Sequence, residues 1–226
     1  MVTPAGRSSG SHALRSTGPL SFVLCLAMLA ATGCQRFPEG PSDPSPSIST
    51  AQAPLQQPLS DAKAFQVERS NISFTVTPRF RYSVQAVVLH RESYYAGWQA
   101  ELAPCDLALG WGELIARDLH HRVRWSQGGR WYHWRTGSDF PENNSFVAKH
   151  SANTHIVPAN DLVAAAVCAL DADDDVALDG MLVDLRGQRG TEQYVWKSST
   201  SRDDRADGSC EVMWVTRVRA RGRIFE

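Results

Sequence analysis

Alternation between apolar and polar side chains is the strongest constraint on the fold of this chain. In the segment 72–77, the apolar Ile72, Phe74 and Val76 alternate with serine and threonine, and the segment 80–88 repeats the pattern. A period of two places successive side chains on opposite faces of a β-strand. Both segments are therefore predicted to be strands with one buried face.

Two further regions carry local signals for a hairpin and a helix. A glycine pair at 128–129 separates the aromatic and β-branched runs 122–125 and 130–135, which is typical of a β-hairpin. Asn160, placed before an apolar run that ends at Leu170, predicts a capped and buried helix.

The C-terminal part is predicted to add three strands, and one short helix is expected near 113–120. The strands cover 176–185 with a bulge at Gly180, then 193–196, and finally 211–224. Strands outnumber helices and no βαβ spacing repeats. The predicted class is therefore α+β: a mainly antiparallel sheet or a small, partly open barrel, OB-like in one version, with one or two short helices.

An export signal precedes this domain. Arg7 and Arg15 form a positive leader, and 22–31 is an apolar core of about 10 residues, well short of the ~20 that span a bilayer. The small residues at 31–33, directly before Cys34, resemble the lipobox of bacterial lipoproteins, a pattern that prefers leucine at the first of these places.

This resemblance implies a membrane-anchored lipoprotein of the cell envelope that faces the periplasm. Cys34 would be lipidated, with palmitate among its acyl chains, and become the first mature residue. Several acyl chains anchor a protein stably, whereas one chain alone is marginal. Gln35 at the next position favours the outer membrane by the same resemblance. A secretory signal cleaved near Gly33 is the alternative.

The chain is predicted to have three parts. They are the signal peptide 1–33, a lipidated cysteine with a proline-rich tether over 34–60, and a single β-rich domain over 61–226. The tether carries six prolines, a composition typical of an extended, semi-rigid linker. Loss of the two leader arginines moves the formal charge from -1 to -3, which argues against nucleic-acid binding.

Three cysteines remain once Cys25 and Cys34 are set aside. An exported protein meets an oxidising compartment, where a disulfide is the common fate of a cysteine pair. Cys168 lies in a small apolar run, where a buried thiol behaves as a hydrophobic side chain. The predicted disulfide therefore joins Cys105 to Cys210, and a catalytic Cys105 is the alternative.

The segment 150–155 is the densest polar set, and its candidate catalytic residues are His150, Asn153 and His155. A histidine there can act as general base while the asparagine orients it or stabilises negative charge. On a loop, both histidines could instead reach a metal ion. A third ligand is available from Asp106, His121 or His133. In the remaining alternative, these side chains only hydrogen-bond the loop and cap the following helix.

Two surfaces are candidates for binding, one aromatic and one basic. On the strand 130–135, alternation separates Trp131 and His133 from Tyr132 and Trp134, so one face is core and the other can stack on sugars or on a protein. Arginines alternate along the last predicted strand and would meet lipid phosphates, lipopolysaccharide or an acidic partner. The alternative is a solvated edge strand. The candidate binding residues are Trp131, Trp134, Arg217, Arg219, Arg221 and Arg223, with Arg122, Arg124, Arg130 and Arg135 as additions.

The acidic segment 171–175 does not form an EF-hand. Its spacing copies the first positions of a calcium loop, but Val176 stands where that loop needs glycine and Leu182 where it needs glutamate. An exposed turn is predicted instead. The domain 61–226 also contains no GxSxG, HExxH, CxxC, P-loop or GxGxxG motif, so the enzyme classes that depend on them lack their signature.

The sequence therefore predicts a lipid-anchored envelope protein that acts as a binding or scaffolding module through an aromatic and arginine-rich surface. The expected partner is an envelope protein, a glycan or an anionic lipid, and no cofactor or metal is assigned. The alternative function is a small periplasmic hydrolase, metal- or histidine-dependent, centred on His150 and His155.

Overall fold

One long strand, β3 (Ile72–Ser93), organises the fold. The computed structural model describes residues 36–201 and 210–226, which belong to one unit, Cys34–Glu226. The two predicted strands 72–77 and 80–88 are both parts of β3, which bends at two register shifts. Bulges of this kind turn a strand around the corner of a barrel.

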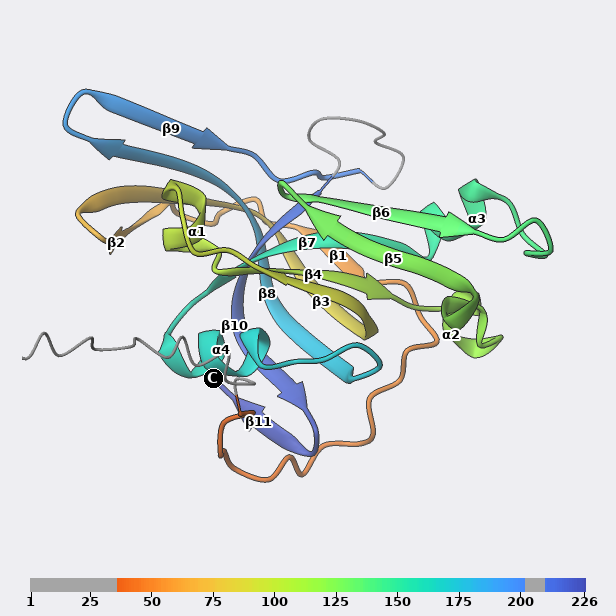
Figure 1. Cartoon of the computed structure of the whole chain (residues 1–226). Helices are drawn as coiled ribbons and strands as arrows, with labels where there is room; N and C mark the ends of the chain where they lie inside the picture. The colour runs from red at the N-terminus through yellow and green to blue at the C-terminus, as the bar shows by residue number, and fades with distance from the viewer. Residues whose placement is uncertain (1–35, 202–209) are drawn as a thin grey trace, which may run out of the picture. The chain divides into compact units, whose positions relative to one another are not determined.

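Five strands close a ring around the core. β3 pairs antiparallel with β4 (Cys105–Gly110), β4 with β7 (Ser151–Pro158), and β7 pairs parallel with β10 (Glu211–Ala220). β10 pairs antiparallel with β8 (Asp175–Arg189), which returns to β3 (Figure 1). If these five strands are numbered by their order in the chain, their order around the ring is 1-2-3-5-4. This is the connectivity of an OB-fold barrel. The predicted α+β class with a small OB-like barrel is confirmed.

Alternate residues of these strands fill the barrel, and α4 (Asp161–Cys168) packs against β7, β10 and β11 (Arg223–Phe225). The predicted cap is present: the Asn160 side chain accepts a hydrogen bond of 2.9 Å from the backbone N–H of Val163. The bulge predicted at Gly180 lies instead on the partner strand β10, between Val215 and Arg217, whereas Gly180 keeps its register with Tyr82 on β3. The glycine at position 180 has a different role. A Cβ there would lie 1.9 Å from the carbonyl oxygen of Trp214 on β10, so only glycine lets the strands approach.

A second apolar cluster lies where α1 (Trp98–Leu102), β2 (Phe65–Arg69) and β9 (Glu192–Trp196) meet the start of β3. Trp98 stacks on Tyr194 with 5.1 Å between ring centroids and meets Trp196 edge to face. Trp214 belongs to the same cluster and Trp111 to the barrel core. These four indoles are therefore structural.

An insertion between β4 and β7 covers the outer face of these two strands. It contains the hairpin of β5 (Val123–Gly128) and β6 (Trp131–Thr136), so the predicted hairpin is confirmed (Figure 1). The helix expected near 113–120 is two short pieces, α2 (Glu113–Ala116) and the 3₁₀-helix η1 (Leu119–Arg122). The insertion ends with α3 (Asn144–Lys149).

The proline-rich segment, expected to be an extended tether, packs on the domain over its described part, 36–60. Its last residues form β1 (Leu55–Pro58), which pairs with β3. Asp43 binds Arg219, and Phe37 packs edge to face on Phe225. The expectation of a free linker is wrong for these residues, because Asp43 and Phe37 contact residues near the C-terminal end of the chain. Cys34 and the predicted signal peptide 1–33 lie outside the described residues.

The described residues contain no helix long and apolar enough to cross a membrane.

Candidate functional site

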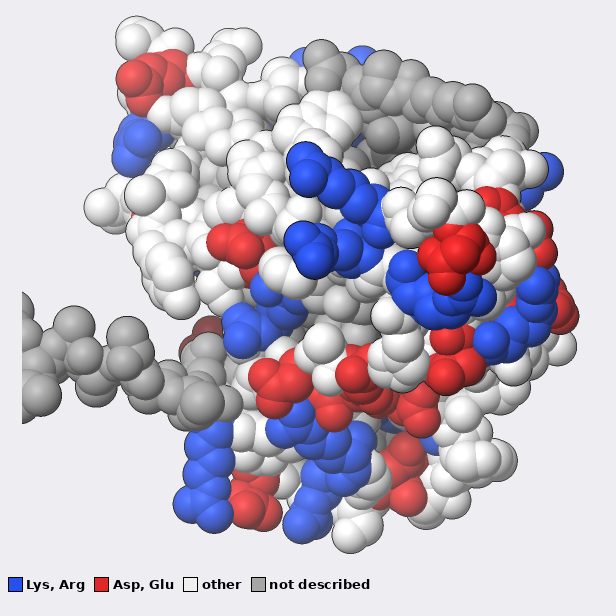
Figure 2. Space-filling view, turned by 45° about the vertical axis from the view of Figure 1, so that its right-hand side comes forward, with Lys and Arg blue, Asp and Glu red and all other residues white. Residues whose placement is uncertain are grey.

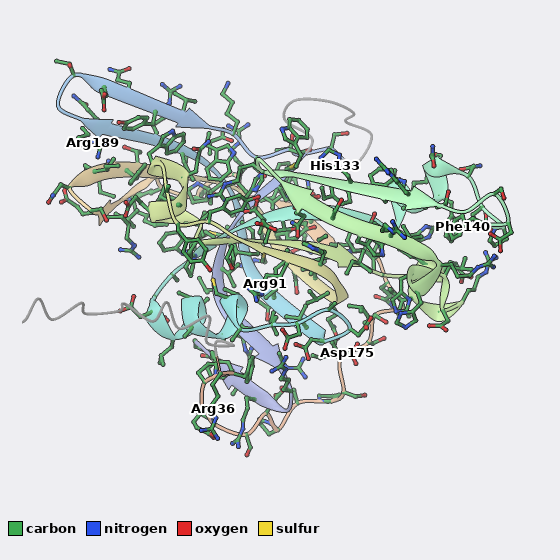
Figure 3. All side chains as sticks on the ribbon, in the orientation of Figure 1. Arg36, Arg91, His133, Phe140, Asp175 and Arg189 are labelled. Atoms are coloured by element: carbon green, nitrogen blue, oxygen red, sulfur yellow. The ribbon has the colours of Figure 1, made fainter. Side chains whose placement is uncertain are left out.

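The outer face of the β5–β6 hairpin combines an exposed indole with positive charge. Alternation turns five side chains away from the large sheet: Arg124, Ser126, Trp131, His133 and Arg135. Trp131 is 37% exposed, and Figure 3 shows His133 on β6. The sequence prediction of two faces is confirmed, and Trp131 lies on the outer one. Trp134 lies on the inner face, with its ring 5.1 Å from that of Tyr132, so it does not join the outer surface.

Arg124 and Arg135 stand directly opposite each other in the hairpin ladder. Within the part of the chain that the structure describes, neither makes an ion pair. Like charges directly opposite in an antiparallel pair destabilise a sheet. Two adjacent guanidinium groups instead match a phosphate, sulfate or carboxylate group, which each can bind in a bidentate manner. The pair is thus arranged for an external anion.

A solvent-open cavity of about 590 Å³ lies beside this pair. Its walls are His121, Arg122, Val123, Arg124, Arg135, Thr136 and Gly137. Arg122 donates to the side chain and the carbonyl of Asp139, at 2.9 and 2.8 Å, so its charge is already matched. The free charges at the cavity are those of Arg124 and Arg135.

Arg130 clamps the tip of the hairpin to the barrel. Gly129 and Arg130 form a two-residue turn with φ of 59° and 72°, as in a type I′ hairpin. The left-handed conformation costs a non-glycine residue roughly 1–2 kcal/mol. The side chain offsets this cost: its guanidinium donates to Asp106 Oδ1 at 2.6 Å and to the Ala103 carbonyl at 2.9 Å. It also lies 3.6 Å from the ring centre of Tyr94.

A buried polar network continues beneath the turn. Asn153 Nδ2 donates to the Arg130 carbonyl at 2.9 Å, and Asn153 Oδ1 accepts from Gln127 Nε2 at 2.6 Å. His155 Nδ1 lies 2.9 Å from Asp106 Oδ2. Asp106, Asn153 and His155 are all at most 3% exposed, so the hairpin shuts them off from solvent. These side chains seat the hairpin on β4 and β7.

The structure separates the two candidate catalytic histidines. The segment 151–158 is strand β7 and not a loop, so His155 lies about 13 Å from the first residue of the strand, Ser151, at ~3.3 Å per residue. His150 precedes the strand and ends α3, where its Nδ1 lies 2.8 Å from the carbonyl oxygen of Phe146. Among the described residues, neither histidine belongs to a group of possible metal ligands, so the alternative of a shared metal site is not formed. The loop was mispredicted because β7 is buried along its whole length and shows no alternation.

The four C-terminal arginines do not form one free row. β10 ends at Ala220, and Arg221-Gly222 turn into β11, both with positive φ. Each arginine pairs within the chain: Arg217 with Glu226, Arg219 with Asp43, Arg221 with Asp171 and Asp174, and Arg223 with Glu39. Figure 2 shows acidic and basic side chains lying side by side over much of one face. The expected stripe on a single long strand is therefore wrong, and these four arginines do not form one free basic surface.

The cysteines differ from the predicted pairing. Cys105 Sγ lies 2.7 Å from Cys168 Sγ, whereas Cys210 Sγ lies 3.5 Å from Asn153 Nδ2, and all three are free thiols. The Cys105–Cys210 disulfide is absent because the two thiols have different neighbours. Burial raises the pKa of Cys210 to about 11, and the contact with Cys168, with burial, raises the pKa of Cys105. Both are protonated at neutral pH, unlike a catalytic thiolate.

No protein-family model matches this chain, and neither does any curated protein or solved structure. The function must therefore be argued from the site, because a barrel fold by itself does not assign one. OB-fold barrels often bind ligands on the face of their second and third strands. In this chain those strands are β4 and β7, and the inserted hairpin covers that face.

Proposed function

We propose that this chain is a lipid-anchored protein of the cell envelope whose barrel domain binds an anionic glycan on the outer face of the β5–β6 hairpin. The observation that carries the binding role is the pair Arg124 and Arg135, which face each other without an acidic partner among the described residues. The exposed Trp131 lies on the same face of the hairpin, four residues before Arg135 on β6. The anchor at Cys34 is supported by the lipobox-like residues 31–33.

Trp131 favours a sugar ligand over a bare anion. An indole face packs on the C–H face of a sugar ring, while the guanidinium groups take the phosphate, sulfate or carboxylate substituents. The cavity of about 590 Å³ falls within the usual range for a small-molecule site and opens toward solvent, as a polymeric ligand requires. The alternative, a hydrolase centred on His150 and His155, has no geometric support, since His155 is 3% exposed and the two histidines belong to different elements.

Titration of the full chain in detergent with dextran sulfate, followed by tryptophan fluorescence, tests the proposal. Neutral dextran has the same sugar backbone without the charge and is expected to bind far more weakly. The variant Arg124→Ala/Arg135→Ala should lose at least about tenfold in affinity, because a charged hydrogen bond contributes ~1.5–3 kcal/mol. Trp131→Ala should weaken binding as well.

The matched control is Arg186→Ala/Arg189→Ala, which removes two exposed arginines of β8 and so changes the net charge equally. Equal loss in both double variants would mean that only overall charge matters, and the hairpin site would be wrong. Unchanged binding in Trp131→Ala would remove the sugar-stacking part of the proposal. Capture of an acidic protein but not of dextran sulfate would replace the glycan by a protein partner.

A further inference from the structure

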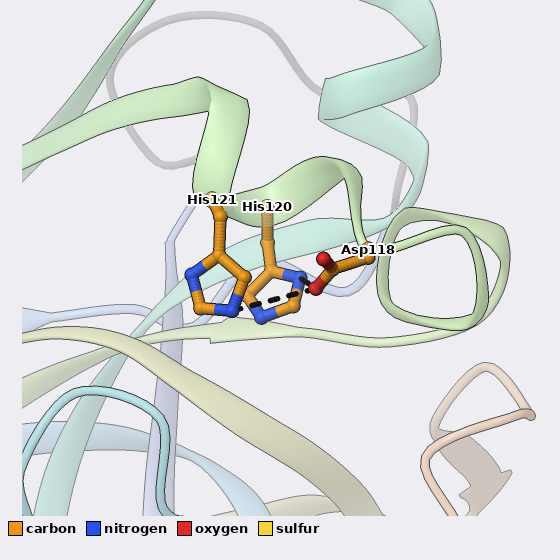
Figure 4. A group of neighbouring side chains, drawn as sticks. All are labelled: Asp118, His120 and His121. Carbon is orange, nitrogen blue, oxygen red and sulfur yellow. Dashed lines mark ion pairs between the residues drawn. The ribbon is translucent and has the colours of Figure 1, made fainter.

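A cluster of ionisable side chains lies at the base of the hairpin, on η1, and shares His121 with the walls of the cavity beside Arg124 and Arg135. Asp118, His120 and His121 converge there (Figure 4), with ligand atoms all within 4.8 Å of one another. The two imidazole rings lie one over the other, with 3.9 Å between centroids and a tilt of 36°. Asp118 Oδ1 is 3.4 Å from His121 Nε2 and 3.9 Å from His120 Nδ1.

Local structure explains why these side chains meet. Asp118 takes the left-handed conformation, with φ of 55°, just before η1, and aspartate tolerates this conformation better than most residues. In a 3₁₀-helix, side chains three positions apart eclipse one another. The turn therefore brings the side chains of Asp118 and His121 together, and Asp118 also lies close to His120.

The geometry fits a tetrahedral metal ion. Zinc binds nitrogen and oxygen ligands at about 2.0–2.2 Å, which sets neighbouring ligand atoms about 3.4 Å apart in a tetrahedron. Two of the three separations, 3.4 and 3.9 Å, lie near this value. The third, between the ligand nitrogens of His120 and His121, lies within 4.8 Å, so the two rings move together when they bind one ion. Two histidines and one carboxylate are also the protein ligand set of zinc sites that keep a fourth position open.

His120 gives an independent indication of a missing ligand. Its side chain is only 9% exposed, and its Nδ1 has no hydrogen-bond partner within the part of the chain that the structure describes. A buried polar atom left unpaired costs about 1–3 kcal/mol, which a bound cation would remove.

Asp173 faces the opposite edge of the same two rings. Its Oδ1 lies 3.7 Å from His120 Nε2 and 3.7 Å from His121 Nδ1. These separations are those of an ion pair and are longer than a hydrogen bond. A carboxylate that hydrogen-bonds the far nitrogen of a metal-binding histidine fixes the tautomer and the ring orientation, and Asp173 is placed to do so after a small movement. The acidic turn 171–175 thus contributes Asp173 to the histidines, while Asp171 and Asp174 bind Arg221.

We propose that Asp118, His120 and His121 bind a divalent transition-metal ion, specifically Zn²⁺, with Asp173 as a positioning residue and the fourth ligand position open to solvent. The exposure of Asp118 and His121 gives the ion a path of entry. This proposal departs from the expectation of no metal. The sequence alone offers His121 only as a third ligand for a site built on His150 and His155.

Titration of the full chain with ZnCl₂, after removal of metal by EDTA and buffer exchange, tests the site by calorimetry. One Zn²⁺ per chain is expected, with saturable binding. His121→Gln and Asp118→Asn, which alter exposed side chains and preserve the fold, should each weaken binding at least tenfold. Asp173→Asn should weaken it by about 10–100-fold, as for other carboxylates that orient histidine ligands. His133→Gln is the matched control and should bind as the unaltered chain does.

Three outcomes would overturn the proposal. The first is the absence of saturable binding in the unaltered chain. The second is an unchanged affinity in both His121→Gln and Asp118→Asn while circular dichroism shows an intact fold. The third is an equal loss in His133→Gln, which would place the zinc on the hairpin face instead of on η1.

Discussion

Among single residues, Arg130 has the largest expected effect on stability. Its guanidinium compensates Asp106, which is fully buried, and removal of one partner of such a pair leaves an unpaired charge inside the protein. Arg130→Ala is expected to lower the free energy of unfolding by about 3–5 kcal/mol, measured by urea denaturation. Arg124→Ala, on the outer face of the same hairpin, should change it by less than ~0.5 kcal/mol. A similar loss of unfolding free energy in both variants would contradict the structural role of Arg130 at the tip of the hairpin.

His120 should make stability depend on pH in a predictable direction. Its pKa is lowered from 6.5 by burial and then by His121, so the unfolded chain takes up a proton at a higher pH than the folded chain does. Stability is therefore complete above pH ~6.5 and falls as the pH drops below that value. In EDTA, the unaltered chain should lose more unfolding free energy between pH 7.5 and 5.5 than His120→Gln does. Equal losses in the two chains would contradict the attribution of this pH dependence to His120.

Among the elements, the segment 36–48 is expected to depend on one ion pair. Asp43 and Arg219 meet at 2.6 Å, with both side chains largely buried. Burial opposes the charged carboxylate, yet hydrogen bonds from the Ser45 backbone and Arg219 lower the pKa of Asp43 to about 2. Arg219→Ala should therefore speed proteolytic cleavage within 36–48 several-fold, whereas Arg189→Ala should not. Equal cleavage rates in the two variants would show that other contacts hold the segment.

The elements that could be predicted from the sequence are those with local signals. The alternation in β3, the Asn160 cap of α4 and the glycine turn of the hairpin all depend on residues close in the chain. β4 and β7 were missed because both are buried on both faces and carry polar residues that pair with other segments. Period and propensity give no signal for such strands.

The candidate site was predictable only in part. Alternation along β6 assigned Trp131 and His133 to one face and Tyr132 and Trp134 to the other, as the structure has them. The pairing of the C-terminal arginines with carboxylates depends on contacts with Glu39, Asp43 and the acidic turn, far apart in the chain. The proposed zinc site likewise combines η1 with Asp173, which comes from the turn between α4 and β8. The spacing of residues in the sequence does not show which distant residues come into contact, so neither feature could be predicted.

For the whole molecule, the insertion between β4 and β7 sets where ligands can bind. The hairpin occupies the barrel face that β4 and β7 would otherwise expose, and Arg130 locks it there (Figure 1). A hairpin fixed in this way presents its own outer face as a rigid surface, which lowers the entropy cost of binding. The barrel therefore acts as a support, and the insertion carries the proposed binding role.

The salt dependence of dextran sulfate binding tests the central claim most directly. If Arg124 and Arg135 both contact the anion, the slope of log affinity against log salt concentration should be shallower by about 1.4–1.8 in Arg124→Ala/Arg135→Ala than in the unaltered chain, since each neutralised anionic group contributes ~0.7–0.9. The control Arg186→Ala/Arg189→Ala should keep the original slope. A slope unchanged in the hairpin variant would contradict the account, because the two arginines would then not bind the ligand.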